Sequence, residues 1–269
     1  MIARMWLRAA AVAVGIACGA GSGVAADNPP PNKPVFSFGN LKGMTADAAK
    51  AKAKAYLQKA GSFDEKAFAD IWKNDSRTVL DRTADSLALS NTEAAAALAA
   101  ARKQDGPAPV TVPGVFKDAS TDAFFRANIA AAYAKALAGR SVYEEALEAL
   151  KTVQPELVVD PAAFYFHKAV AEAKLIQRDA ATVSISRLLD DVTDAPDRYK
   201  MVATLLFFDM QNWSRDEKDL TNIGRLMDNS GRRLDLARGG PQTQDIQKKI
   251  VFRLDEVIKE LENKSKGGT

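Results

Sequence analysis

Residues 121–150 read TDAFFRANIAAAYAKALAGRSVYEEALEAL. The first half of this stretch is apolar on nearly every side of a helix, whereas the second half, from Tyr143, has one apolar stripe and one acidic face. A helix that is apolar on more than one face must be covered on more than one side. We therefore expect a helical hairpin whose first helix is inner and whose second helix lies in an outer layer.

The same arrangement recurs farther along the chain. Long helices are expected to begin near residues 120, 161 and 196, each followed by a short turn and a shorter helix, which gives a repeat of about 35 to 40 residues. The first helices of the later pairs are also apolar on several faces, over 164–166 and 205–208. This spacing predicts an array of helical hairpins. The core is expected to contain the aromatic residues Trp72, Phe124, Phe125, Phe164, Phe207, Phe208 and Trp213.

Helical periodicity covers most of the remaining chain, and no stretch alternates apolar and polar residues well enough to indicate a strand. The sequence therefore predicts an all-α fold of stacked antiparallel helical hairpins with a C-terminal capping helix. Helices are expected over residues 45–60, 63–73, 76–89, 91–103, 119–138, 142–153, 161–177, 180–192, 196–212, 215–229 and 242–263.

Several helix starts are predicted from capping signals. In a capping box, a Ser hydroxyl accepts from an amide of the first turn while a Glu three residues later reaches back to the cap. Two Asp residues that precede a proline, Asp160 and Asp194, indicate further helix starts. The predicted boxes are Ser62-x-x-Glu65, Ser90-x-x-Glu93, Ser141-x-x-Glu144 and Ser214-x-x-Glu217.

Proline-rich segments and the helical region divide the chain into six parts. The prolines that follow the predicted signal peptide favour an extended conformation, which indicates a tether. The segments are a signal peptide (1–26), a Pro-rich tether (27–44), an N-terminal helical region (45–103), a linker (104–118), a helical-hairpin repeat region (119–238) and a C-terminal helix and tail (239–269). The sequence leaves open whether the linker separates two domains or is a long loop within one.

The first 26 residues have the pattern of a secretory signal peptide. Arg4 and Arg8 precede a short apolar run over 9–17, and small residues over 24–26 precede Asp27. No later segment is apolar over the roughly 20 residues that a transmembrane helix needs. We expect a periplasmic or secreted protein that begins at Asp27. The alternative is a lipoprotein that is acylated at Cys18, the only cysteine.

Composition is that of a globular protein, with 47% hydrophobic and 26% charged residues. The formal net charge falls from +3 to +1 once Arg4 and Arg8 are removed, so the charge does not favour a nucleic-acid partner. Three short basic clusters, Lys50/Lys52/Lys54, Arg232/Arg233 and Lys248/Lys249, are interleaved with acidic residues and are expected on solvated helix faces.

The sequence offers little for catalysis. The chain contains one histidine, His167, and its neighbours favour a packed structural role. No zinc motif, calcium loop, phosphate-binding loop or nucleophile elbow is present, so we expect no metal and no cofactor. Glu144, Glu145 and Glu148 share one face of an amphipathic helix and are expected to be solvated.

Residues 121–192 resemble the tetratricopeptide repeat family. Tyr143 and Ala146 match the aromatic and small residues that open the second helix of that repeat, and Pro155 lies near the position of its terminal proline. In the next unit Phe164 matches the bulky position of the first helix, but no Gly follows it, and Val183 stands where Ala is usual. The segment 239–249 is also similar to a tail found in uncharacterised exported bacterial proteins.

The resemblance implies a protein-binding scaffold whose concave groove is lined by first-helix residues. With Phe164 at the bulky position, Tyr165 and Glu172 face that groove and are the candidate partner-binding residues. We expect a non-catalytic protein that binds another protein or a component of the cell envelope. The alternatives are an all-α hydrolase or lyase that uses carboxylates, and a purely structural envelope protein.

The last helix has one apolar stripe and an opposite face of charged pairs. We expect it to pack across the end of the hairpin array; the alternative is a partner helix or short coiled coil. The stripe consists of Ile246, Ile250, Leu254, Val257, Ile258 and Leu261.

Overall fold

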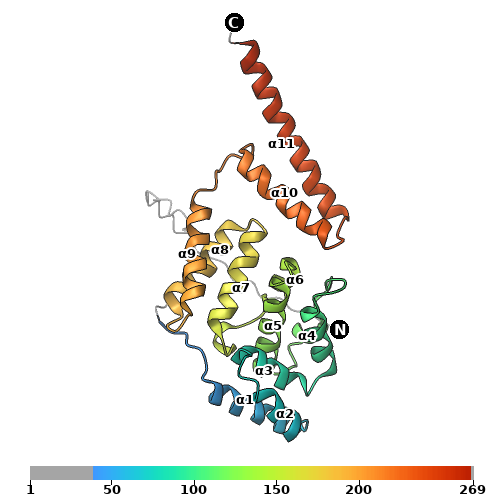
Figure 1. Ribbon diagram of the computed structural model, residues 1–269, viewed down its shortest axis with the longest axis vertical. Helices are drawn as coiled ribbons and strands as arrows, with labels where there is room; N and C mark the ends of the chain where they lie inside the picture. Colours follow the sequence, from blue (N-terminus) through green and yellow to red (C-terminus); the bar gives the residue numbers. More distant parts are fainter. Residues whose placement is uncertain (1–38, 268–269) are drawn as a thin grey trace, which may run out of the picture. The chain divides into compact units, whose positions relative to one another are not determined.

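The computed structural model describes residues 39–267, which belong to one compact unit. Within that range the chain forms eleven α-helices and no strand; its one β-bridge joins Leu41 and Val192 (Figure 1). The prediction of an all-α fold is confirmed for these residues. The predicted signal peptide, Cys18 and the tether up to residue 38 lie outside the described residues.

Each of the eleven expected helices is present, with ends shifted by a few residues. A π-helical turn over Arg187–Asp191 continues α8. The helices are α1 (Ala46–Lys59), α2 (Glu65–Trp72), α3 (Val79–Ala88), α4 (Thr92–Arg102), α5 (Ala123–Ala138), α6 (Tyr143–Leu150), α7 (Pro161–Lys174), α8 (Arg178–Ser186), α9 (Asp197–Gln211), α10 (Leu220–Asp235) and α11 (Pro241–Lys266).

The predicted serine caps are wrong, although the helices predicted from them are present. Asp64, Asn91 and Asp219 cap α2, α4 and α10, because each places a side-chain oxygen on an amide of the first turn. Ser141 has a φ of 60°, and α6 begins after Val142 without a side-chain cap. For α2, α4 and α10 an Asp or Asn farther along the chain is the acceptor, which the Ser-x-x-Glu pattern does not reveal. The serines concerned are Ser62, Ser90, Ser141 and Ser214.

Of the two Asp–Pro signals, one is correct. Asp160 caps α7 by accepting from the Ala163 amide at 2.8 Å. Asp194 does not cap α9, which begins at Asp197; its carboxylate instead accepts from the Gly43 amide at 3.1 Å. The aspartate of the second signal is thus used to hold a segment that is distant in sequence.

The corrected cap assignment is testable with a matched pair. Asp64→Ala is expected to lower the free energy of unfolding by about 1 kcal/mol, because the Ala67 amide at the start of α2 loses its acceptor at 3.0 Å. Ser62→Ala is the control: its hydroxyl donates only to the exposed Ala60 carbonyl, so the loss should stay below about 0.5 kcal/mol. Denaturant unfolding of both variants measures the difference, and equal losses would restore the serine assignment.

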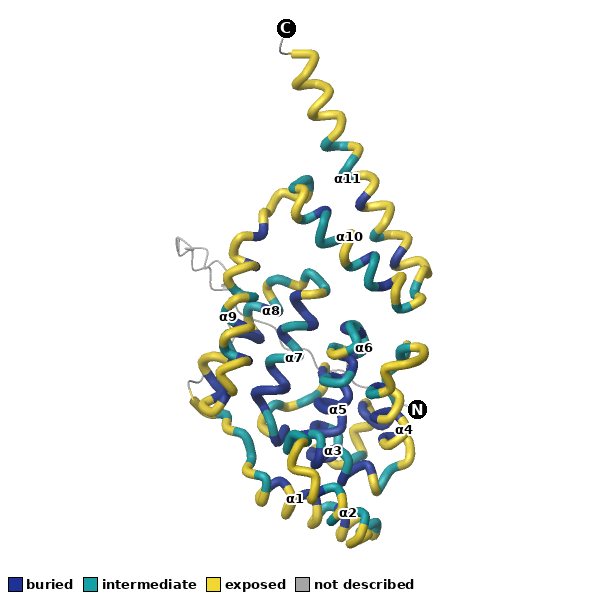
Figure 2. Tube along the Cα trace, viewed as in Figure 1, coloured by how far each residue is buried: buried dark blue, intermediate teal, exposed yellow. Residues whose placement is uncertain are grey.

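The core is centred on α5 and α7 (Figure 2). Helix α5 packs against α3, α4, α6 and α7, and α7 packs against α5, α6, α8 and α9. Phe125 on α5 is fully buried. The buried Asn128 side chain donates to the Phe124 and Leu157 carbonyls and accepts from the Val159 amide, which ties α5 to the segment before α7. Both helices are covered on several sides, as their composition predicted.

The predicted linker, 104–118, lies within the compact unit rather than between two units. Val115 and Phe116 of this segment are buried, and the Phe116 ring packs edge-on against Tyr133 at 5.0 Å. Because α3 and α4 pack directly on α5, the N-terminal helices and the repeat region share one core.

Residues 39–44, the end of the predicted tether, form backbone hydrogen bonds with the segments that precede α7 and follow α8. The Leu41 amide donates to the Asp191 carbonyl at 2.9 Å, and the Leu41 carbonyl accepts from the Thr193 amide at 3.0 Å. The Met44 amide donates to the Val159 carbonyl at 2.9 Å. This segment therefore crosses the α8–α9 connection before α1 begins.

Helix α9 does not have the inner position that its apolar run predicted. Leu205 and Phe208 are 64% and 60% exposed, and Leu206 and Phe207 are only partly buried. Helices α7 and α8 pack against α9 and cover one side of it. The assignment of Phe208 to the core is therefore wrong, because among the described helices only α7 and α8 pack closely against α9.

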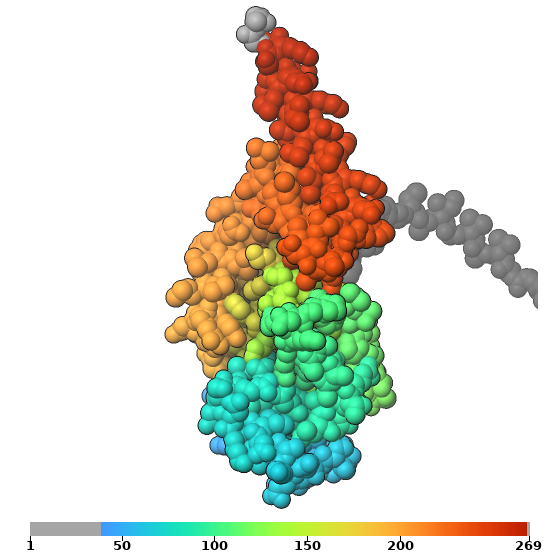
Figure 3. All heavy atoms as spheres, turned by 45° about the vertical axis from the view of Figure 1, so that its right-hand side comes forward, coloured from blue at the N-terminus to red at the C-terminus, as the bar shows by residue number. Residues whose placement is uncertain are grey.

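Helices α10 and α11 pair with each other as a hairpin, and the expectation that α11 lies across the end of the array is wrong. The C-terminal half of α11 projects beyond the other described elements (Figure 3). Ile258 and Leu261 of the predicted stripe are consequently exposed.

Candidate functional site

A groove of about 650 Å³ lies between α6 and α8, with α7 as its floor. Leu147 and Leu150 of α6 line one wall and Val183 of α8 lines the other. The floor contains Tyr165 and Glu172, the two candidate partner-binding residues. The structure therefore brings both residues to one surface depression.

The Glu172 carboxylate is buried and already has two partners. Lys168 donates to its Oε1 at 2.6 Å, and the Ser184 hydroxyl donates to its Oε2 at 2.5 Å. Lys168 also donates to the Ser184 oxygen at 2.9 Å. Because the carboxylate is neutralised and hydrogen-bonded, Glu172 positions Lys168 and joins α7 to α8.

Tyr165 presents an aromatic side chain to the groove. Its ring packs edge-on against Phe164 at 5.0 Å. Burial raises the pKa of Tyr165 to about 12, so the hydroxyl stays protonated at neutral pH. Tyr165 can therefore offer an apolar surface and a hydrogen-bonding hydroxyl, but not a negative charge.

The accessible charge of the groove is mainly positive. Lys151, Lys168 and Arg187 line it, and each keeps part of its side chain exposed. Each of these cations is paired with a carboxylate and is the more exposed partner: Lys151 with Glu148, Lys168 with Glu172 and Arg187 with Asp191. Glu148 also pairs with Lys117, which holds the pKa of Glu148 below its usual range. The third carboxylate that lines the groove, Glu144, is bonded to arginines. The groove thus combines apolar walls with cationic side chains.

The resemblance located Tyr165 and Glu172 but missed most of the groove. It implied a surface lined by first-helix residues, whereas the second helices α6 and α8 form both walls. Lys168, Ser184 and Arg187 were not singled out. The two cations could have been found from the sequence by their i,i+4 spacing to a carboxylate, Lys168 to Glu172 and Arg187 to Asp191, which predicts an ion pair on a helix.

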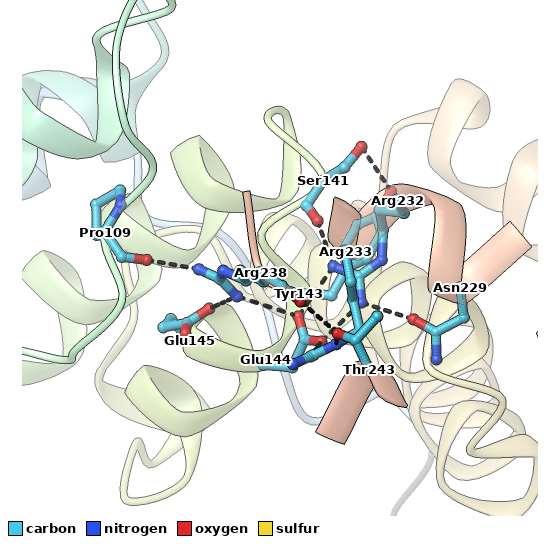
Figure 4. A network of polar contacts seen from close by, with 10 residues as sticks. All are labelled: Pro109, Ser141, Tyr143, Glu144, Glu145, Asn229, Arg232, Arg233, Arg238 and Thr243. Carbon is cyan, nitrogen blue, oxygen red and sulfur yellow. Dashed lines mark hydrogen bonds and ion pairs between the residues drawn. The ribbon is translucent and has the colours of Figure 1, made fainter. Parts of the chain in front are cut away.

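A second polar cluster joins α6 to the α10–α11 hairpin (Figure 4). Glu144 accepts two parallel hydrogen bonds from Arg232, at 2.9 and 2.7 Å, and another from Arg233 at 2.5 Å. Arg238 donates to Glu145 at 2.9 Å and to the Pro109 carbonyl at 2.8 Å.

These contacts correct two expectations. Glu144 and the Arg232/Arg233 pair are not on solvated faces; Arg233 is buried and the other two are partly buried. Burial alone would raise the pKa of Glu144, but the hydrogen bonds from Arg232 and Arg233 hold it below its usual range. Because every carboxylate oxygen of Glu144 is occupied, this cluster is structural.

The lone histidine packs against aromatic rings, next to Phe166 and Tyr199. Burial, with a contribution from Lys135, lowers the pKa of His167 to about 4, so the imidazole is neutral. Asp160, whose pKa burial raises, is committed to capping α7. These groups fit structural roles.

Among residues 39–267, no group of three or more His, Cys, Asp or Glu residues could hold a metal ion. None of the helices in that range combines the length and the apolar character needed to cross a membrane.

No protein-family model, curated protein or solved structure matches this chain.

Proposed function

We propose that this protein is an exported, non-catalytic scaffold of the cell envelope that binds a partner protein in the groove between α6 and α8. The observation that carries the proposal is the groove itself, an apolar trough with a buried tyrosine on its floor and cationic side chains at its edges. Such a surface suits an extended peptide segment with an apolar side chain next to acidic residues.

We propose further that helices α5 to α9 form a TPR-like array. In support, α7 packs against both helices of the preceding pair, α5 and α6, and α9 packs against both α7 and α8. In solenoid proteins each repeat packs on its neighbours in this way and leaves an extended surface for a partner. The groove would then lie between the second helices of successive pairs, α6 and α8.

Charge decides between possible occupants. In the ion pairs of the groove the cation is the more exposed partner, and Glu144 is already bonded to arginines. An acidic segment would gain from Lys151 and Arg187, whereas a basic one would be repelled.

The test is a comparison of synthetic peptides that contain one aromatic or leucine residue flanked by Glu, with matched peptides flanked by Lys. Val183→Glu is expected to weaken binding of the acidic peptides by about tenfold or more, and Lys151→Glu by several-fold. Val110→Glu is the control, because Val110 is 68% exposed and lies outside the groove. Fluorescence anisotropy measures each affinity.

Equal binding of acidic and basic peptides, or equal losses from Val183→Glu and Val110→Glu, would contradict the proposal. A circular dichroism spectrum for each variant separates a loss of binding from a loss of folding.

A further inference from the structure

Large apolar side chains are exposed along one stripe of α10. Leu220, Met227 and Leu234 are 65%, 53% and 48% exposed. They are seven residues apart and therefore lie on one side of the helix. Monomeric proteins seldom expose apolar residues in such continuous rows.

Helix α11 carries a matching stripe. Val251, Ile258 and Leu261 are 59%, 52% and 60% exposed, and the partly buried Leu254 lies between them. The spacing of three and four residues places all four on one side of α11, as in a coiled-coil seam.

Both stripes lie on the same side of the α10–α11 hairpin. On α10, Met227 and Leu234 follow the buried residues Ile223 and Ser230 by four positions; on α11, Leu254 follows the buried Ile250 by four. Four residues turn about 400° around a helix, so each stripe residue lies about 40° beyond the buried residue that it follows. The direction of this offset is the same on both helices. Antiparallel helices are related by a local two-fold axis, so equal turns bring both stripes to one face.

The face continues past the end of α10. Helix α10 has 16 residues and α11 has 26, or about 24 and 39 Å at 1.5 Å per residue. Lys218, just before α10, pairs with Glu260 on α11. Leu261 and the residues after it therefore extend beyond the partner helix.

Two glycines make the α10 side of the face flat. Gly224 and Gly231 lie next to the stripe, and a Cβ atom added at either would meet nothing within 4 Å. Glycine destabilises a helix interior relative to alanine, and here it leaves room for another helix to approach closely.

We propose that a second copy of this chain covers this face, in a symmetric dimer whose two α11 helices run antiparallel. A two-fold axis near position 256 brings Val251 opposite the partner's Leu261 and Leu254 opposite the partner's Ile258. The projecting end of each α11 then lies over the α10–α11 face of the other copy. The projecting end of each α11 thereby covers the apolar residues that the other copy's hairpin exposes.

The charges beside the stripe are self-complementary in this arrangement. Along the outer flank of α11 the signs alternate through Lys248, Asp255, Lys259 and Glu262. When the row is reversed about position 256, Lys248 faces the partner's Glu262 and Asp255 faces the partner's Lys259. Opposite charges at such flanking positions select helix partners and their orientation.

The apolar area is of the size that a dimer requires. Six side chains, each about half exposed or more, present on the order of 500 Å² of apolar surface per copy, and a stable interface buries about 800 Å² from each partner with its polar rim included. This interface is separate from the groove between α6 and α8, so its test does not depend on the peptide-binding proposal.

Sedimentation equilibrium of the chain from Asp27 to Thr269 tests the proposal. A dimer is expected at micromolar concentration, and Ile258→Glu should raise its dissociation constant about a hundredfold. Leu205→Glu is the matched control: Leu205 is 64% exposed on α9, outside the α10–α11 face, so the dimer should persist.

A charge exchange distinguishes this pairing from other associations. Lys248→Glu and Glu262→Lys should each weaken the dimer by several-fold, and the double variant should recover it. The two residues are about 21 Å apart within one α11, so recovery requires contact between copies. A monomeric wild-type chain, a dimer insensitive to Ile258→Glu, or a double variant as weak as the single ones would overturn the proposal.

Discussion

Glu144→Ala is expected to lower the free energy of unfolding by about 3 to 5 kcal/mol, which is a large share of the stability of a typical domain. The change removes the carboxylate that accepts from Arg232 and Arg233 and lies 3.6 Å from Arg238. Arg232 and Arg233 would then keep their charge in a largely buried site without a carboxylate partner. Denaturant unfolding measures the loss.

The control for this prediction lies one helical turn away. Glu148→Ala removes an exposed carboxylate that pairs with Lys117 and Lys151, and the free energy of unfolding should stay close to that of the wild type. Limited proteolysis should also show earlier cleavage within α10 and α11 in Glu144→Ala, because this cluster joins the hairpin to α6. A loss as small as that of Glu148→Ala would mean that the hairpin is held by its other contacts.

The second large effect concerns pH. Between pH 6.5 and about 4 the unfolded chain protonates His167, whereas the folded chain keeps it neutral, since burial lowers its pKa to about 4. The unfolded state therefore binds more protons in this window, and stability falls as the pH falls. At about 1.4 kcal/mol per pKa unit, His167 accounts for a loss of about 3 kcal/mol between pH 6.5 and 4.

The variant His167→Leu isolates the contribution of His167 to this loss of stability. The variant should lose less stability than the wild type on going from pH 7 to pH 4, by about 3 kcal/mol. The comparison is needed because neighbouring groups also titrate: Asp81 has a lowered pKa and adds to the loss, and Asp160 has a raised pKa and opposes it. Parallel pH profiles of the two proteins in urea unfolding would contradict a lowered pKa of His167 in the folded state.

The candidate groove was predictable in part. Phe164 and the spacing of the second repeat placed Tyr165 and Glu172 on one surface by resemblance. Ser184 and Arg187 could not be found that way, because their place in the groove depends on how α8 packs against α7. The sequence also does not indicate that Glu172 is saturated by Lys168 and Ser184 rather than exposed to a partner.

The sequence by itself determined the helices. Their number and approximate limits follow from the 3.6-residue period, and the apolar composition of α5 and α7 predicted their central position. Periodicity and composition are local properties, and eleven local patterns sufficed to locate eleven helices. The same local information placed the serine caps wrongly; at Ser62 and Ser90 a competing acceptor, Asp64 or Asn91, lies within two residues.

Only the tertiary structure decided which helix faces are covered. The apolar run over 205–208 made α9 look like an inner helix, but α7 and α8 cover only one side of it and leave Leu205 and Phe208 exposed. Arg232 and Glu144, 88 positions apart, meet because the α10–α11 hairpin turns back onto α6. Such contacts depend on the directions in which successive helices leave their turns, and no period within a single helix contains that information.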